Sequence, residues 1–235
     1  MKLLISVLDE KEALEAYNGG ADIIDVKNPL EGSLGASPPR IVKAVKNVLP
    51  KKTEVSVAVG DVPDLPGTVS LAVLGAAQLK VDYIKIGLYG PKTVENAYRL
   101  VKEAWETIKN YKPKTKLVLA SYADYDRVGC LSPEKVLEIS SKTGVDVFMI
   151  DTKIKDGKKS LDFLDMDRIK KLVKKAHNRN LMVALAGSLT KKDIPKLFDV
   201  GVDVVGFRTE ACGGDRINGR IKSKIVAEIV KLMKN

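Results

Sequence analysis

The chain has 235 residues, 45% of them hydrophobic and 30% charged, a composition typical of a folded globular protein rather than a disordered one. No apolar run reaches the length of about 18 residues that spans a bilayer, and the N-terminus lacks the apolar core and cleavage site of a signal peptide. We therefore expect a cytoplasmic protein. The net charge of +10 is compatible with an anionic substrate, a nucleic-acid partner or a lysine-rich solvated surface.

Residue types that often mark catalytic or metal sites are scarce. The only histidine, His177, falls at a predicted helix end, where a polar or cationic residue suits the helix dipole. Cys130 and Cys212 are far apart and outside any Cys-x-x-Cys spacing, so we predict neither a disulfide framework nor a zinc site. A Ser-His-Asp triad and a multi-histidine metal site are disfavoured, because their parts are missing.

Apolar, β-branched segments alternate with helix-period segments from one end of the chain to the other. The predicted strands are Leu3–Val7, Asp22–Lys27, Glu54–Val59, Tyr83–Leu88, Lys116–Ser121, Val147–Thr152, Leu181–Ala186 and Val204–Arg208. Amphipathic segments such as Pro91–Asn110 and Asp165–Arg179 separate them. This order predicts an α/β protein, a single (β/α)8 TIM barrel over residues 1–235. An open doubly wound sheet is the alternative, but no Gly-x-Gly-x-x-Gly follows the first strand.

A short motif recurs at every second predicted strand, an internal repeat that favours the barrel. In each copy an apolar residue and an aspartate open the strand, at Asp22, Asp82, Asp146 and Asp203. We expect these aspartates in turns at the bottom of the barrel, because barrel chemistry occurs at the carboxyl ends of the strands. Three post-strand segments are predicted as loops on that active face, namely Asn28–Pro39, Gly60–Gly67 and Thr152–Leu164.

Charged residues interrupt the apolar strands near their carboxyl ends. They are Asp25 and Lys27, Lys85, Asp151 and Lys153 with Lys155 just beyond, and Arg208. Strand alternation places Lys27 and Lys85 inside the barrel, where an unpaired ammonium is costly. One interpretation is structural, with Asp25–Lys27 and Asp151–Lys153 as simple ion pairs. The other is catalytic, because an amine in an apolar site beside other cations loses its proton and attacks carbonyls.

A candidate anion site follows the last two predicted strands. Gly187 and Ser188 come after the seventh strand, and Arg208, Gly213 and Gly214 come at and after the eighth. Barrels often bind phosphate in these loops through backbone N–H groups, so we predict that the substrate is a small phosphorylated carbonyl compound. A simple glycine turn is the other interpretation of Gly213 and Gly214.

The residues around these positions resemble a known family, the (5-formylfuran-3-yl)methyl phosphate synthases of archaeal methanofuran biosynthesis. The resemblance covers essentially the whole chain, and its longest motif is the segment 19–36, which reads Gly-Gly-Ala-Asp-Ile-Ile-Asp-Val-Lys-Asn-Pro-Leu-Glu-Gly-Ser-Leu-Gly-Ala. Further matching segments are 83–87, 149–152, 154–157 and Phe207-Arg208.

The resemblance implies a lyase-type synthase that condenses two molecules of glyceraldehyde 3-phosphate into a furan aldehyde phosphate. Lys27 matches the family's Schiff-base lysine and Lys85 its proton donor and acceptor, while Asp25, Asp151 and Lys155 match residues that line the same site. Lys153 receives no role. No metal or organic cofactor is required, because the imine itself is the electron sink. Neither a nucleic acid nor a membrane is implied as a partner, and the oligomeric state is left open, a homo-oligomer included.

Three rival functions remain to be weighed against this one. A class I aldolase or transaldolase would share Lys27 and the phosphate loops. An orotidine-phosphate-decarboxylase-like enzyme would need a second aspartate where this chain has Leu30. A non-catalytic nucleic-acid-binding barrel is suggested by net charge alone and predicts binding that weakens steeply with salt.

Overall fold

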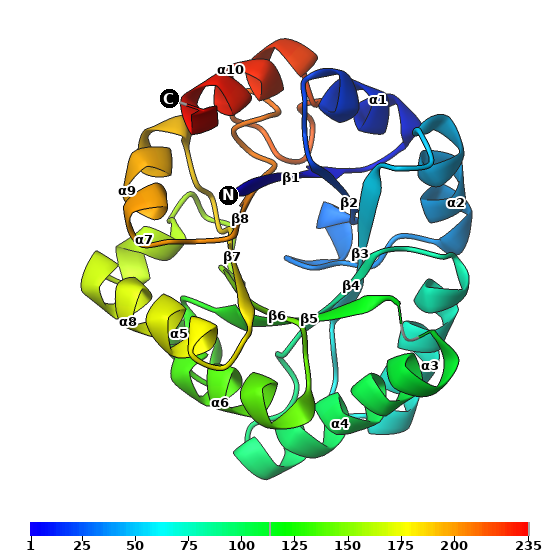
Figure 1. Ribbon diagram of the computed structural model, residues 1–235, viewed down its shortest axis with the longest axis vertical. Helices are drawn as coiled ribbons and strands as arrows, with labels where there is room; N and C mark the ends of the chain where they lie inside the picture. Colours follow the sequence, from blue (N-terminus) through cyan, green and yellow to red (C-terminus); the bar gives the residue numbers. More distant parts are fainter. Residues whose placement is uncertain (113, 235) are drawn as a thin grey trace.

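A computed structural model describes residues 1–112 and 114–234, in which eight parallel strands close into a barrel in their sequence order. The strands are β1 (Lys2–Val7), β2 (Ile23–Val26), β3 (Glu54–Asp61), β4 (Tyr83–Gly87), β5 (Lys116–Tyr122), β6 (Val147–Asp151), β7 (Met182–Leu185) and β8 (Val204–Phe207). The ring closes through pairing of β8 with β1 (Figure 1). The predicted TIM barrel is confirmed.

The helices form a layer around the outside of the ring (Figure 1). They are α1 (Glu10–Asn18), α2 (Pro39–Val48), α3 (Pro66–Gln78), α4 (Val94–Tyr111), α5 (Tyr125–Val128), α6 (Pro133–Thr143), α7 (Ser160–Phe163), α8 (Met166–His177), α9 (Ile194–Asp199) and α10 (Ser223–Lys234). Two 3₁₀ turns, η1 (Pro29–Glu31) and η2 (Lys191–Asp193), lie in the loops after β2 and β7. Pro113 and Asn235, inside the predicted domain range 1–235, lie outside the described residues.

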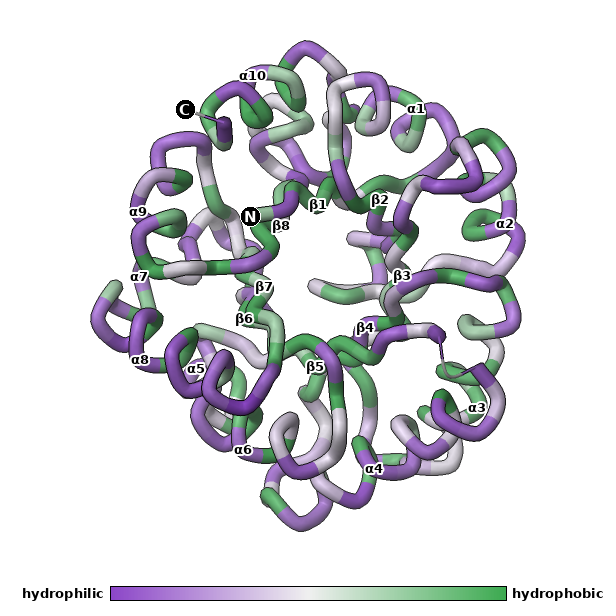
Figure 2. The backbone as a smooth tube through the Cα atoms, viewed as in Figure 1, coloured by the Kyte–Doolittle hydropathy of each residue, from purple (hydrophilic) through white to green (hydrophobic). Residues whose placement is uncertain are grey.

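Buried apolar side chains form two layers, which follow from the alternation of side chains along each strand. Residues such as Ile24, Ile84 and Leu119 point outward and pack against the helices in the larger cluster. Their neighbours Ile23, Tyr83 and Val118 point inward and fill the barrel interior. Both sides of the sheet are therefore buried, so the strands are mostly apolar while the helices are polar on their outer sides (Figure 2).

The repeated aspartates lie at the bottom of the barrel, as predicted. Each accepts a hydrogen bond from a backbone N–H at the start of the preceding strand, at 2.7 Å for Asp22 with Leu3 and for Asp203 with Val183, and at 2.8 Å for Asp82 with Val55 and for Asp146 with Leu117. An aspartate before every even strand thus caps the odd strand beside it. His177 ends α8 and contacts Asp203 at 2.8 Å, so the expected helix-end position is also confirmed.

The predicted loop Gly60–Gly67 is wrong at both ends. Strand β3 continues to Asp61, and α3 begins at Pro66, where proline suits the first turn of a helix. Glycine alone does not end a strand, because Gly60 with φ of +119° still extends the chain and carries Asp61 to the mouth of the barrel. The predicted loops Asn28–Pro39 and Thr152–Leu164 each contain a short helical turn, η1 and α7.

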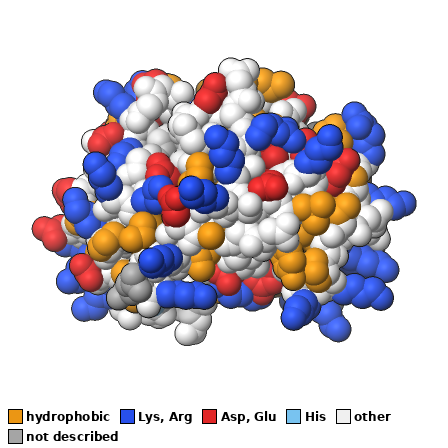
Figure 3. Space-filling model, turned by 90° about the horizontal axis from the view of Figure 1, so that it is seen from above, with side chains coloured by type: hydrophobic (Ala, Val, Ile, Leu, Met, Phe, Trp, Pro, Cys, Tyr) orange, Lys and Arg blue, Asp and Glu red, His pale blue; other side chains and the backbone are white. Residues whose placement is uncertain are grey.

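The outer surface is rich in charge of both signs. On the face in Figure 3, lysine and arginine side chains are spread widely, with acidic side chains and small apolar patches among them. Among the described residues, none of the helices is long and apolar enough to cross a membrane.

Candidate active site

A pocket opens at the carboxyl ends of the strands, on the side of the barrel formed by β6, β7, β8, β1 and the end of β2. Its volume is about 420 Å³, counting the part that is open to solvent. The lining side chains are mostly polar and include Ser6, Lys27, Asp151, Lys155, Ser188, Arg208, Thr209 and Arg216. The pocket therefore lies on the face where the sequence predicted the chemistry.

Lys27 follows β2 directly and is buried, with 6% of its surface exposed. Among the described residues it forms no ion pair within 4 Å, so its ammonium form would be poorly stabilised. Burial, aided by the positive charges of Lys85 and Lys155, lowers the pKa of Lys27 to about 7 against the opposing effect of Asp151 and Asp25. Lys27 is thus an amine that is substantially unprotonated near neutral pH.

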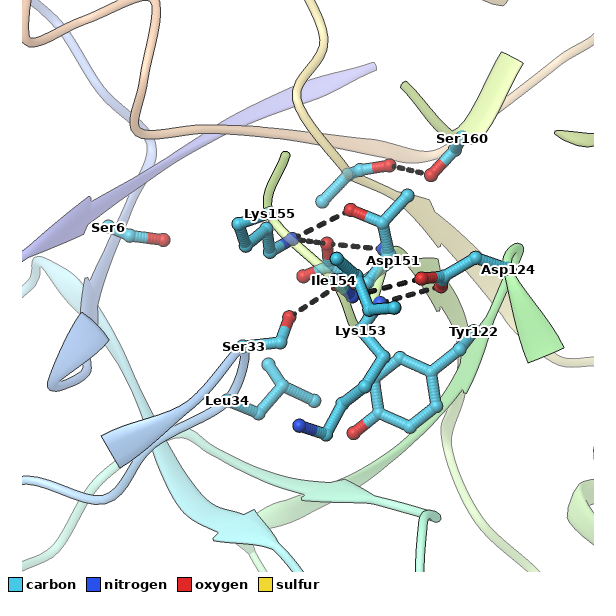
Figure 4. Close-up of polar contacts among 12 residues, drawn as sticks. Ser6, Ser33, Leu34, Tyr122, Asp124, Asp151, Lys153, Ile154, Lys155 and Ser160 are labelled. Carbon is cyan, nitrogen blue, oxygen red and sulfur yellow. Dashed lines mark hydrogen bonds and ion pairs between the residues drawn. The ribbon is translucent and has the colours of Figure 1, made fainter. Parts of the chain in front are cut away.

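Lys155 reaches the same pocket from the loop after β6. Its Nζ lies 2.5 Å from Oδ1 of Asp151, the last residue of β6, and donates to the Thr152 hydroxyl at 3.0 Å (Figure 4). Burial raises the pKa of Asp151, but the charges of Lys155 and Lys27 outweigh it, so the pKa falls below its usual value. Asp151 is therefore an anion, and its buried Oδ2 has no partner among the described residues.

Asp25 and Lys85 lie below the pocket as a buried ion pair. Lys85 Nζ is 2.5 Å from Asp25 Oδ2. The Lys85 side chain is 1% exposed and the Asp25 side chain is 0% exposed. Neither is among the residues that line the pocket. Ser6 of β1 connects them to it, because its hydroxyl donates to Asp25 Oδ2 at 2.8 Å while the residue lines the pocket. Figure 4 shows Ser6 across this space from Lys155.

The ion pairs of the structural interpretation, Asp25–Lys27 and Asp151–Lys153, are not the ones that form. Asp25 pairs with Lys85 from β4, and Asp151 pairs with Lys155, four residues further along the chain. Lys153 instead lies 3.3 Å from Asp61 and over the ring of Tyr89. Alternation fixes which side of a strand a residue occupies, but the partner across the barrel depends on side-chain length and barrel geometry.

The other half of the barrel mouth is closed by the segment after β2, which enters the ring in Figure 1. Leu34 is fully buried and packs with the apolar residues of the barrel interior. Asp61 accepts from the Ser33 amide at 3.0 Å and from the Tyr122 hydroxyl, and Ser33 Oγ donates to the Thr152 carbonyl at 2.7 Å. This plug, residues 28–36, confines the pocket to one side of the barrel.

The predicted anion site is partly assembled in the structure. Gly187, Ser188 and Arg208 all line the pocket, together with Leu189. The residues 187 and 188 have positive φ values of 99° and 54°, and among the described residues the amides of 187–189 donate no hydrogen bond. Free N–H groups in such a turn are a common anion-binding arrangement.

Gly213 and Gly214 are not brought to the pocket. Both are exposed, and their amides already donate to the carbonyls of Glu210 and Thr209, at 3.0 and 2.8 Å. The structure therefore favours the glycine-turn interpretation for this pair.

Arg216, Thr209 and Ser6 are pocket residues that sequence reasoning missed. For Ser6 a signal was present, because it occupies an inward position near the end of β1. For Arg216 there was none, since the irregular loop 208–222 has no periodicity from which the direction of a side chain could be inferred.

Comparison with known proteins gives a family model described as 4-HFC-P synthase, which matches residues 3–230. The chain belongs to this family. One family member, (5-formylfuran-3-yl)methyl phosphate synthase of Methanocaldococcus jannaschii, is 50% identical over 235 residues, covering 100% of both chains. Another of the same name, from Methanopyrus kandleri, is 47% identical over 99% of this chain and 98% of its own. The resemblance noted in the sequence is thereby confirmed.

Solved structures of lower identity share the fold of this 4-HFC-P synthase family member. Phosphoribosyl anthranilate isomerase from Thermus thermophilus superposes with a TM-score of 0.67 at 13% identity, covering 100% of this chain and 98% of that chain. KGPDC from Streptococcus mutans gives a TM-score of 0.65 at 14% identity, covering 99% of this chain and 97% of that chain. At these identities the likeness concerns the barrel alone.

Several expectations about this family member remain predictions. The described residues form no group of three or more His, Cys, Asp or Glu arranged for a metal, and both cysteines are free. The absence of a nucleic-acid partner and the roles of the individual site residues stay predictions.

Proposed function

We propose that the protein condenses two molecules of glyceraldehyde 3-phosphate into 4-(hydroxymethyl)-2-furancarboxaldehyde phosphate, with release of one inorganic phosphate and two water molecules. Family membership supports this reaction, because the relatives carry the name of the furan phosphate synthase. The observation that carries the mechanism is Lys27, a buried amine with a pKa of about 7 inside a pocket that also has anion-binding groups.

In the proposed mechanism, the Lys27 nitrogen attacks the carbonyl carbon of one triose, and loss of water gives an imine. The imine draws electrons from the neighbouring carbon, which loses a proton and becomes an enamine. The enamine expels the phosphate of its own triose, and the resulting methylene carbon attacks the carbonyl of the second triose, which has isomerised to its ketone, to form the new carbon–carbon bond. Ring closure and loss of two water molecules then give the aromatic furan, and water hydrolyses the imine to release the aldehyde and free Lys27.

Two sets of side chains are suited to move the protons. Lys155 and Asp151 act directly, since both line the pocket and Asp151 Oδ2 is free to accept. Lys85 and Asp25 act from below, because the Lys85 charge helps to keep the Lys27 pKa low and Asp25 exchanges protons through the Ser6 hydroxyl. The phosphate group of the substrate lies against the free amides of 187–189.

The test is incubation of the purified chain with glyceraldehyde 3-phosphate, followed by ultraviolet spectra and an assay for inorganic phosphate. We expect a new furan absorption that grows in proportion to the phosphate released. A plain sugar phosphate, without furan absorption and without released phosphate, would instead indicate a class I aldolase and contradict the proposed function.

A further inference from the structure

The cations around the pocket differ in whether a carboxylate neutralises them. Lys155 is paired with Asp151, and Arg208 with Glu12 at 2.9 Å. Lys27, with a pKa of about 7, alternates between the neutral and the charged form near neutral pH. Arg216 is different, because among the described residues no carboxylate lies within 4 Å of its guanidinium. Its Nη2, like that of Arg208, is buried without a hydrogen-bond partner. A buried guanidinium nitrogen without a partner needs an explanation, because its desolvation is costly.

Arg208 is held in place on three sides. Its Nη1 donates to Glu12 Oε2 at 2.9 Å and to the Ser6 carbonyl at 3.0 Å, and its Nε donates to the Arg216 carbonyl at 2.8 Å. Arg208 and Glu12 are 3% and 1% exposed in their side chains, so the pair is a fixed and neutral unit. Arg208 thereby positions the backbone that carries Arg216.

The loop around Arg216 is fixed by contacts of its own. Asp215 accepts from the amides of Ile217 and Asn218 at 2.9 and 3.0 Å, which forms a tight turn. Arg220 anchors the end of the loop to Asp9 at 2.5 Å. Arg216 is therefore presented to the pocket by a braced turn.

We propose that Arg216 is the residue that selects a phosphorylated substrate, because among the described residues it is the only permanently charged group that lines the pocket without a carboxylate within 4 Å. The guanidinium fork matches two phosphate oxygens. Residues 187–189 line the same pocket, and their amides, which donate no hydrogen bond among the described residues, are available to the remaining oxygens. Arg208 is a positioning residue that acts through its hydrogen bond to the Arg216 carbonyl. Its own Nη2, which has no partner among the described residues, is available as an additional donor. The identity of the ligand as a triose phosphate rests on the proposed function, but the affinity for phosphate does not.

Equilibrium binding of inorganic phosphate to the purified full chain, measured by calorimetry, tests this assignment without turnover. We expect Arg216→Gln to weaken phosphate binding at least tenfold. The matched control is Lys222→Gln, which removes one positive charge from an exposed position at the end of the same loop and should bind like the unaltered chain. Equal affinity for the Arg216→Gln and unaltered chains, or no phosphate binding by the unaltered chain, would overturn the proposal.

A second measurement uses the unaltered chain and so does not depend on whether the variant folds. Phenylglyoxal modifies accessible arginines, and mass spectrometry locates the modified residues. Saturating phosphate should protect Arg216 at least fivefold and leave the exposed Arg220 reactive. An Arg216 modification rate that phosphate does not change would contradict the proposal.

The positioning role of Arg208 has a kinetic test. Arg208→Lys keeps a charge opposite Glu12 but cannot hold both Glu12 and the Arg216 carbonyl. We expect a higher KM for glyceraldehyde 3-phosphate with kcat nearly unchanged, and no change in the borohydride-trapping rate with unphosphorylated glyceraldehyde. A fall in kcat at constant KM would contradict the positioning role of Arg208.

Phosphate binding through Arg216 in a chain that makes no furan would refute the proposed function and leave this inference standing.

Discussion

The two ends of the barrel use aspartates in different ways. At the bottom, four aspartates at equivalent positions before the even strands accept backbone N–H groups, and each is at least partly exposed to solvent. At the mouth, Asp25 and Asp151 are almost completely buried and paired with lysines. The aspartates at the bottom follow the internal repeat of the sequence, whereas those at the mouth do not. One half of the mouth is filled by the plug and the other half is the pocket.

This difference indicates that the aspartates at the bottom stabilise the fold, whereas the charged residues at the mouth serve the chemistry. A capped strand end gains a hydrogen bond at little desolvation cost, since the carboxylate keeps contact with water. A buried ion pair seldom repays the desolvation of both charges. The lysines and aspartates of the mouth are therefore poor candidates for stabilising residues. Burial is the main cause of the lowered Lys27 pKa, and the charges of Lys85 and Lys155 add to it.

The largest expected effect is on Lys27. Lys27→Arg keeps a positive charge but has no nucleophilic amine, so furan formation should fall by at least about 10⁴-fold, as for other lost covalent nucleophiles. Initial rates of ultraviolet absorbance measure the change, with circular dichroism as the control for folding. If the variant kept a tenth of the activity, covalent catalysis by Lys27 would be excluded.

The second effect concerns the buried pair below the pocket. Lys85→Ala should lower kcat by at least about 10²-fold, the usual loss for an acid–base group. It also leaves Asp25 buried and unpaired, which should destabilise the fold by about 3–5 kcal/mol in urea unfolding. Near-normal turnover in a folded variant would restrict Lys85 to a structural role.

The pH dependence should show a change of about tenfold per pH unit on the acid side, because each unit below the pKa reduces the unprotonated Lys27 tenfold. With a pKa of about 7, kcat/KM should rise with pH up to about 7 and level off above it. In a Lys85→Met variant the rise should move to higher pH, since the cation that lowers the Lys27 pKa is gone and Asp25 is left unpaired. A profile that is flat from about pH 5.5 to 8 in the unaltered chain would contradict the lowered pKa.

The smallest effect is expected at the bottom of the barrel. Asp82→Ala removes the acceptor for the Val55 amide and should cost about 1 kcal/mol of unfolding free energy, with kcat nearly unchanged. Urea unfolding and initial rates measure the two quantities on the same preparation. A large loss of activity without loss of stability would show that the two ends of the barrel are not functionally separate.

The sequence was sufficient for the barrel because the strands are continuous apolar runs and the Asp motif marks every second one. It also placed Lys27 and Lys85 inside, since both alternate with outward-facing isoleucine and valine. It could not give the partner of Asp25, because contacts across the barrel depend on strand tilt and side-chain length. Nor could it predict the position of Arg216, since that residue is placed by hydrogen bonds of an irregular loop with Arg208.

The most direct test of the account is reduction of the enzyme–substrate mixture with borohydride, followed by mass spectrometry of the peptides. The account predicts a single reduced adduct on Lys27, formed only in the presence of glyceraldehyde 3-phosphate. An adduct on Lys155 or Lys85, or no adduct while furan is still produced, would contradict it.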